Sequence, residues 1–135
     1  MIETVTCEAL REALDSHENP YILDVRTDVE CELVRLDCDY HHRPLHNFDA
    51  AAEAKAIKSD HPGRPVFMLC KKGGRAMKAA QELDEQGIET IKVIDGGIDA
   101  CYINGVYCIH NPDGPDEETC HQAIQDSMKR YEQSR

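Results

Sequence analysis

The sequence predicts an α/β domain with a largely parallel sheet. Short apolar, β-prone segments alternate with helical patterns along most of the chain, as they do where strands are joined by crossover helices. The segment 65–69 (PVFML) is apolar almost throughout, which is typical of a strand covered on both faces. With 135 residues, the chain can bury one core but is too short for two ordinary domains.

The first part of the chain predicts two strands and two helices. Residues 2–5 form the first strand, and Thr6 is a candidate N-cap for a helix over 7–16. Residues 21–25 form the second strand, and residues 30–36 are expected to form a short helix.

The middle of the chain predicts a loop, a helix and a further strand. Residues 37–48 lack a clear period, so we expect a brief strand within a loop. Asp49 caps an alanine-rich helix that reaches about Lys58 and is broken by residues 61–63 (HPG). The buried strand over 65–69 follows.

The next segment predicts another helix, strand and helix. A helix over 75–86 is followed by Gly87, at the position of a left-handed C-cap. Residues 91–94 form a strand, and the pair Gly96-Gly97 opens a turn and a short helix.

From residue 112 onward the composition becomes polar and acidic, with one helix predicted over 117–131. We therefore expect a domain over 1–111 and a C-terminal helical extension over 112–135. The extension carries apolar side chains at helical spacing, namely Ala123, Ile124, Met128 and Tyr131. This face can pack on its own domain, which we favour, or on a partner chain, so we expect a monomer or a homodimer.

The overall charge limits the classes of partner. A formal net charge of -11 argues against a general binder of nucleic acid or of anionic membranes, because both need a positive field. No export signal is apparent, and no segment is long and apolar enough to span a bilayer. Seven cysteines without an export signal indicate thiols in a reducing compartment, so we expect a cytoplasmic location.

The feature that carries chemistry is the order strand, Cys70-Lys-Lys-Gly-Gly-Arg75, helix. In an open parallel sheet, ligands bind beyond the carboxyl ends of the strands, which is where Cys70 is predicted to lie. The N–H groups of a glycine-containing turn can converge on an anion, and the helix N-terminus adds a favourable dipole. Gly73 and Gly74 permit the tight curvature, and the same field favours the nucleophilic thiolate.

Two lysines strengthen this interpretation of Cys70. Lys71 and Lys72 precede a helix N-terminus, where a cation costs roughly 0.3–1 kcal/mol that an anionic ligand would offset. The ordinary alternative is a buried structural cysteine at a strand end, because free cysteine packs as a small hydrophobe. The combination of strand, glycine pair, three cations and helix favours the reactive cysteine.

Three motifs, in the same order along the chain, resemble the rhodanese family of single-domain sulfurtransferases. They are Cys70-x-x-Gly73-x-Arg75, the segment 23–26 (LDVR) followed by Glu30, and the segment 93–100 (VIDGGIDA). The resemblance covers about residues 2 to 108. It implies a rhodanese-like fold, with a five-stranded, mostly parallel sheet and helices on both faces.

The resemblance also implies a chemistry for Cys70. This cysteine would take sulfane sulfur from a small anionic donor such as thiosulfate or polysulfide, and pass it as a persulfide to cyanide or a thiol, without a cofactor. Lys71 and Lys72 would attract the donor, and the N–H groups of residues 71 to 75, Gly73 and Gly74 included, would hold the persulfide. Arg75 would help to close the loop.

By analogy with the family, Asp24 and Arg26 would support the loop from the neighbouring strand end. A surface ion pair after the strand is an equally weighted alternative for these two residues.

The loop length and three departures bear on substrate choice. Four residues separate Cys70 from Arg75, whereas related phosphatases and arsenate reductases have a wider Cys-x5-Arg loop, so sulfur is favoured. Ala76 replaces the family's usual Ser or Thr, and Cys101 replaces an aromatic residue. A segment rich in Cys and His replaces the Gly-His-Ile-x-Gly-Ala element expected after Glu30.

Three alternatives remain open. A metal site could form from Cys31, Cys38, His41, His42 and His46, but these residues lack regular ligand spacing, and we expect no metal. Cys101 and Cys108 could relay persulfide, although burial beside the last strand is favoured. The domain could also be a non-catalytic rhodanese-like binding module, against which the retained Cys70 argues.

Overall fold

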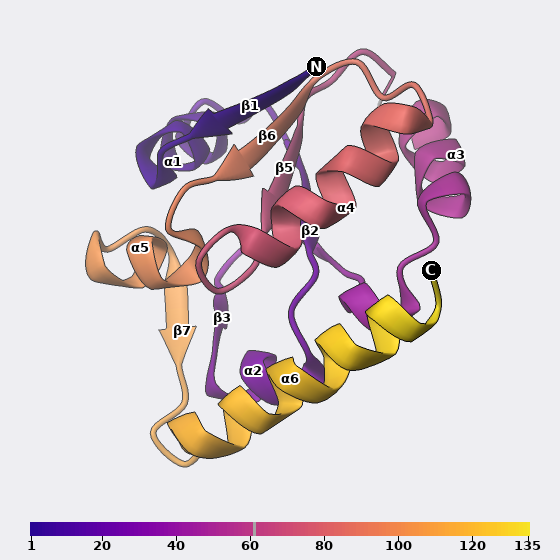
Figure 1. The fold of residues 1–135 in the computed structure, drawn as a ribbon. Helices are drawn as coiled ribbons and strands as arrows, with labels where there is room; N and C mark the ends of the chain where they lie inside the picture. Colours follow the sequence, from indigo (N-terminus) through magenta and orange to yellow (C-terminus); the bar gives the residue numbers. More distant parts are fainter. Residues whose placement is uncertain (61) are drawn as a thin grey trace.

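In the computed structural model, which describes residues 1–60 and 62–135, the chain folds around a five-stranded parallel sheet (Figure 1). The strand order is β1-β6-β5-β2-β4, and every neighbouring pair is parallel. These strands are β1 (Ile2–Val5), β2 (Tyr21–Asp24), β4 (His41–His42), β5 (Val66–Leu69) and β6 (Ile91–Ile94). The predicted fold class is confirmed.

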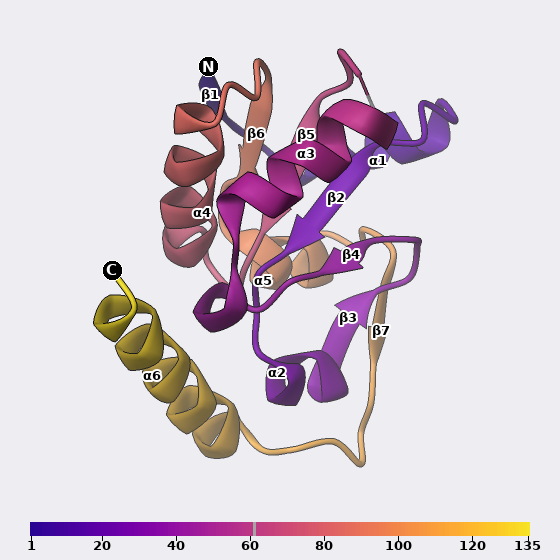
Figure 2. The same cartoon turned by 90° about the vertical axis from the view of Figure 1, so that its right-hand side faces the viewer.

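Helices cover both faces of this sheet (Figures 1 and 2). The helices of the chain are α1 (Cys7–Asp15), α2 (Asp28–Leu33), α3 (Ala50–Asp60), α4 (Gly74–Glu85), α5 (Gly97–Ile103) and α6 (Glu117–Gln133), with a short 3-10 helix η1 (Leu45–Asn47). α1, α3, α4 and α5 lie on the sheet faces, whereas α2 and α6 lie beyond one end of the sheet (Figures 1 and 2). One buried cluster joins the sheet to α3 and α4, and a second joins the opposite face to α1 and α5. His61, within the predicted helix break, lies outside the described residues.

The alternation of side chains along β5 decides where Cys70 points. Phe67 and Leu69 belong to the cluster under α1 and α5, whereas Met68 and Cys70 belong to the cluster under α3 and α4. Successive residues of a strand face opposite sides of a sheet, and Cys70 continues that alternation just beyond the last residue of β5. The sulfur is therefore directed toward the face that α4 covers.

One predicted helix is wrong in both its limits and its length. In place of a helix over 30–36, α2 ends at Leu33 and a strand β3 (Val34–Leu36) follows. Thr27 starts α2 early through a capping box, in which its hydroxyl accepts from the amide of Glu30 and the Glu30 carboxylate accepts from the amide of Thr27. β3 pairs antiparallel with β7 (Cys108–His110), a second small sheet that was not predicted.

The C-terminal helix packs on its own chain, as we expected. Met128 and Tyr131 pack against the cluster under α3 and α4, and Ser127 donates to or accepts from His46 Nδ1 of η1 at 2.7 Å. Figures 1 and 2 both show α6 below α4. The division into a domain over 1–111 and an extension over 112–135 stays a prediction. No helix of the described residues is long and apolar enough to cross a membrane.

Candidate functional site

The Cys70 side chain lies where the sheet, the loop and α4 meet. Its residue is only 1% exposed, and its Sγ accepts a hydrogen bond from the Gly73 amide at 3.0 Å. Gly73 takes a left-handed conformation with φ +119, which lets the chain turn back toward the sulfur before α4 begins. Of the five amides expected around the sulfur, that of Gly73 is the one that bonds to it in the described structure.

The next amides belong to the first turn of α4. Gly74, Arg75 and Ala76 occupy this turn, and the amide of Met77 is the first to bond back along the helix, to the Gly73 carbonyl at 2.9 Å. N–H groups in a first helical turn have no intrahelical acceptor, and they carry the positive end of the helix dipole. The loop therefore offers further donors beside the Cys70 sulfur.

The first turn of α5, which follows the Gly96-Gly97 pair, is hydrogen-bonded to the Cys70 loop. The Ile98 amide donates to the Cys70 carbonyl at 2.8 Å, and the Asp99 amide donates to the Lys71 carbonyl at 3.3 Å. A Cβ on Gly97 would lie 2.2 Å from the Cys70 carbonyl oxygen, closer than any side chain tolerates. Gly97 therefore permits the N-terminus of α5 to bind the main chain at the candidate site.

Arg75 joins the start of α4 to α2. Its guanidinium, 6% exposed, donates to both carboxylate oxygens of Glu30 at 2.7 Å. Burial alone raises the pKa of Glu30, but the hydrogen bonds and charge of Arg75, with those of Thr27, hold that pKa below its ordinary value. The Arg75 guanidinium is therefore bonded to Glu30, and the predicted part of Arg75 in closing the loop stays a prediction.

Asp24 and Arg26 form a buried ion pair, not a surface one. Both residues are at most 1% exposed, and Arg26 Nε and Nη2 donate to the Asp24 carboxylate at 2.8 to 3.1 Å. Arg26 Nη1 also donates to the Val34 carbonyl at 2.7 Å. The pair thus joins the end of β2 to β3. β3 directly follows α2, the helix that carries Glu30, the partner of Arg75.

The two loop lysines have different surroundings. Lys71 Nζ donates to both oxygens of Asp99, at 2.9 and 3.0 Å, so its charge is already compensated. Lys72 is exposed and, in the described part of the chain, has no ion pair. The expectation that both lysines attract the donor therefore rests on Lys72.

Cys70 is among the residues that line a cleft of about 890 Å³ between α4 and α6. Loop residues and α4 line one side, and α6 lines the other. The lining consists of Cys70, Lys71, Lys72, Gly74, Arg75, Met77, Lys78, Gln81, Glu117, His121, Ile124 and Met128. A molecule in this cleft would reach the sulfur from the side of the helix N-terminus.

Comparison with known proteins agrees with this geometry. The family model described as "Rhodanese-like domain" matches residues 6–104. The chain belongs to the rhodanese-like domain family.

Relatives and solved structures extend the match. The rhodanese-like chain is 29% identical over 97 residues to YtwF of Bacillus subtilis, a protein named as a candidate sulfurtransferase, covering 72% of this chain and 87% of that protein. It is 37% identical over 79 residues to the chloroplastic rhodanese-like/PpiC domain-containing protein 12 of Arabidopsis thaliana, covering 58% of this chain. That match spans only 26% of the Arabidopsis protein.

Among solved structures, the fold resembles the polysulfide-sulfur transferase homodimer of Wolinella succinogenes, with a TM-score of 0.64 at 24% identity and coverage of 86% and 84% of the two chains. It also resembles the thiosulfate sulfurtransferase of Pseudomonas aeruginosa, with a TM-score of 0.65 at 22% identity, over 82% of this chain and 20% of that one. Both likenesses support the fold.

The other cysteines and the histidines of this rhodanese-like domain do not form a second centre in the described structure. His41 stacks on Tyr21 at 4.1 Å between ring centroids, His46 bonds to Ser127, and His42 lies 3.6 Å from Cys31 Sγ. No group of three or more Cys, His, Asp or Glu side chains among residues 1–60 and 62–135 is arranged to hold a metal ion.

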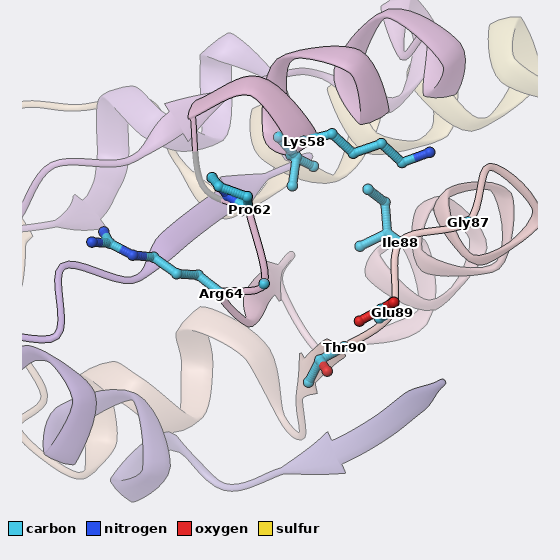
Figure 3. A pocket seen from close by; sticks show the side chains of 9 residues that line it. Lys58, Pro62, Arg64, Gly87, Ile88, Glu89 and Thr90 are labelled. Atoms are coloured by element: carbon cyan, nitrogen blue, oxygen red, sulfur yellow. The ribbon is translucent and has the colours of Figure 1, made fainter.

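A smaller cavity of about 270 Å³ lies at the opposite end of the sheet (Figure 3). The end of α3, residues 62–64 and residues 87–90 line it, so it borders the amino ends of β5 and β6. Cys70 follows the carboxyl end of β5. This cavity is therefore separate from the candidate site.

Sequence reasoning missed several residues that shape the site. Glu30 was noted only as part of a motif, although the pattern Thr27-x-x-Glu30 is a visible capping-box signal that places it at a helix start. Asp99, the partner of Lys71, and the α6 side of the cleft depend on contacts between distant segments. No local pattern could have indicated those contacts.

Proposed function

We propose that this rhodanese-like domain is a sulfurtransferase that carries sulfane sulfur as a persulfide on Cys70. The observation that carries the proposal is that Cys70 Sγ accepts a hydrogen bond from the Gly73 amide, while Cys70 itself is among the residues that line a cleft at the start of α4. Donors of this kind favour an anionic sulfur, because they supply hydrogen bonds and a positive helix end together. Relatives named as sulfurtransferases give further support.

Loading of Cys70 is a displacement at sulfur. The Cys70 thiolate attacks the sulfane sulfur of thiosulfate, a new S–S bond forms, and the donor's S–S bond breaks as sulfite leaves with the electron pair. A polysulfide donor reacts in the same way and leaves shortened by one sulfur. The amides of Gly73 and of the first turn of α4 hold the negative charge of the resulting persulfide.

In the discharge step, Cys70 Sγ is the leaving group rather than the nucleophile. Cyanide or a thiolate attacks the outer sulfur of the persulfide, and Cys70 Sγ leaves with the electron pair of the broken S–S bond. Cyanide becomes thiocyanate, and a thiol becomes a persulfide. Cys70 returns as a thiolate, so no external oxidant or reductant is needed.

The test is turnover with inorganic substrates. The protein is incubated with thiosulfate or polysulfide and with cyanide, and thiocyanate is measured. We expect Cys70→Ser to lower the rate by at least about a thousandfold, because serine cannot replace the sulfur nucleophile. Cys120→Ser is the matched control, since Cys120 is another buried thiol outside the loop. Undiminished turnover in Cys70→Ser, or no turnover in wild type with either donor, contradicts the proposal.

A further inference from the structure

The cleft beside Cys70 is built by two helices that are far apart in the sequence. α4 contributes Met77, Lys78 and Gln81, and α6 contributes the side chains of one face. That face consists of Glu117, His121, Ile124 and Met128, spaced by three or four residues as required for one side of a helix. α6 lies beyond residue 104, where the rhodanese-like family match ends, so this wall is a feature of this chain rather than of the matched region.

A hydrogen bond and an ion pair join the two helices near their C-terminal ends. Tyr131 Oη donates to Glu82 Oε2 at 2.6 Å, and the Arg135 guanidinium contacts the Glu82 carboxylate at 2.9 Å. Met128 and Tyr131 also pack on the buried cluster under α4. The α6 side of the cleft is therefore bonded to α4 near the C-terminal end of α6, and the N-terminal end of α6 lies beside the Cys70 loop.

The cleft is much larger than an inorganic sulfur donor requires. Its volume of about 890 Å³ falls in the range of roughly 300–1,000 Å³ that is typical of sites for organic ligands. Thiosulfate and cyanide need only the space immediately around the sulfur. Beyond the loop, Met77 on α4 and Ile124 and Met128 on α6 give the cleft an apolar strip, beside which Gln81 and His121 also line it.

The charged side chains around the cleft indicate which polar group a ligand of the apolar strip would carry. Lys72 and Lys78 are exposed and have no acidic partner in the described part of the chain, whereas Lys71 is paired with Asp99. Glu117 lines the cleft too and has no ion pair among the described residues, so the unpaired charges there are two cations and one carboxylate. This excess of positive charge beside apolar side chains, in a chain of net charge -11, complements an anion with an apolar body.

We infer that the cleft binds the sulfur acceptor, and that this acceptor is an aliphatic thiol with a terminal carboxylate. The inference rests on the proposed function of Cys70. The carbon chain lies against Met77, Ile124 and Met128, the carboxylate is bound by Lys78 or Lys72, and the thiol reaches the persulfide. The acceptor thiolate attacks the outer sulfur, the bond from that sulfur to Cys70 Sγ breaks, and the acceptor leaves as a persulfide.

The test uses a series of ω-mercaptocarboxylates from mercaptoacetate to 6-mercaptohexanoate. Protein loaded with thiosulfate and freed of excess donor is mixed with each thiol, and the second-order rate constant for persulfide discharge is measured. Each rate is divided by that of the same thiol with glutathione persulfide in solution, which removes differences in intrinsic reactivity. We expect the corrected rate to rise about three- to fourfold per methylene until the cleft is filled, as burial of each CH₂ group predicts.

Two variants locate the effect. Ile124→Asn should flatten the dependence on chain length, whereas Ile103→Asn, at an exposed isoleucine of α5 away from the cleft, should leave it unchanged. Lys78→Gln should keep the dependence on chain length and reduce the several-fold preference for a mercaptocarboxylate over the mercaptoalcohol of equal length, most clearly at low salt.

Cyanide discharge separates this inference from the proposed function. A wild-type protein that loads and discharges to cyanide, but whose corrected rates are independent of chain length, overturns the inference alone. The same holds if the dependence survives in Ile124→Asn. A protein that neither loads nor discharges to cyanide overturns the proposed function, and the acceptor site with it.

Discussion

At the scale of single residues, two buried ion pairs lie near the Cys70 loop. Arg75 and Glu30 form a buried pair with two hydrogen bonds of 2.7 Å, and Asp24 and Arg26 form another beneath α2. The Arg75–Glu30 pair joins the start of α4 to α2, and the Asp24–Arg26 pair joins the end of β2 to β3. A buried charge that loses its partner costs roughly 3–5 kcal/mol.

The Glu30 carboxylate predicts a pH dependence of stability. The folded-state pKa of Glu30 lies below its ordinary value of 4.5, so the carboxylate stabilises the fold above that pH, and this contribution is lost as the pH falls through the folded-state pKa. We expect Glu30→Gln to be less stable than wild type at pH 7 by about 3–5 kcal/mol, because the buried Arg75 charge then has no carboxylate partner. That difference should narrow below pH 4.5.

Denaturant unfolding between pH 7 and pH 3 measures this difference. Glu32→Gln, an exposed position on the same helix, is the control and should run parallel to wild type. A Glu30→Gln deficit that stays constant across the whole range would contradict the assigned role of the ion pair.

Cys101 of α5 and Cys108 of β7 are predicted to have no part in sulfur transfer. Burial raises the pKa of Cys101 to about 12 and that of Cys108 to about 11, so both stay protonated in the neutral range, where the thiolate is the nucleophile. We expect the double variant Cys101→Ala, Cys108→Ala to discharge the Cys70 persulfide within twofold of the wild-type rate. A tenfold loss in a folded double variant would show that a relay through these thiols exists.

At the scale of elements, the loop is held by the start of α5. The strands of the main sheet and the helix after Cys70 could be predicted, because their apolar patterns and glycine signals are local to each segment. The pair β3 and β7 could not, since Val34–Leu36 is short and its partner lies more than seventy residues away. α2 was misplaced because the capping box at Thr27 was not considered.

Gly97→Ala tests the contact between α5 and the loop. A Cβ would lie 2.2 Å from the Cys70 carbonyl oxygen, and φ is +54, so we expect a loss of at least about 2 kcal/mol in stability, from overpacking and backbone strain together. Gly105→Ala is the matched control, because its φ is +69 but the nearest atom to its added Cβ lies 3.9 Å away.

Thermal unfolding and sulfur transfer are measured on both glycine variants. Gly97→Ala should lose stability and most of its activity, while Gly105→Ala should show the smaller cost of the positive φ alone and keep its activity. Equal losses in the two variants would mean that the close approach of Gly97 to the loop does not matter.

At the scale of the whole molecule, the position of Cys70 could be predicted from the sequence, but the residues that surround it in space could not. The position of Cys70 followed from a strand, a glycine-containing loop and a helix that are adjacent in the sequence. The environment of the two lysines did not follow, because Asp99 and α6 reach the loop only through tertiary packing. The apolar face of α6 indicated that this helix packs on something, but its role as a cleft wall depends on where it packs.

The most direct measurement is the mass of the intact protein after incubation with thiosulfate or polysulfide and removal of the donor. The account predicts a gain of one sulfur atom, mapped by peptide analysis to Cys70, removed by cyanide and absent in Cys70→Ser. A wild-type protein whose mass is unchanged by every donor, or whose added sulfur maps to another cysteine, would contradict it.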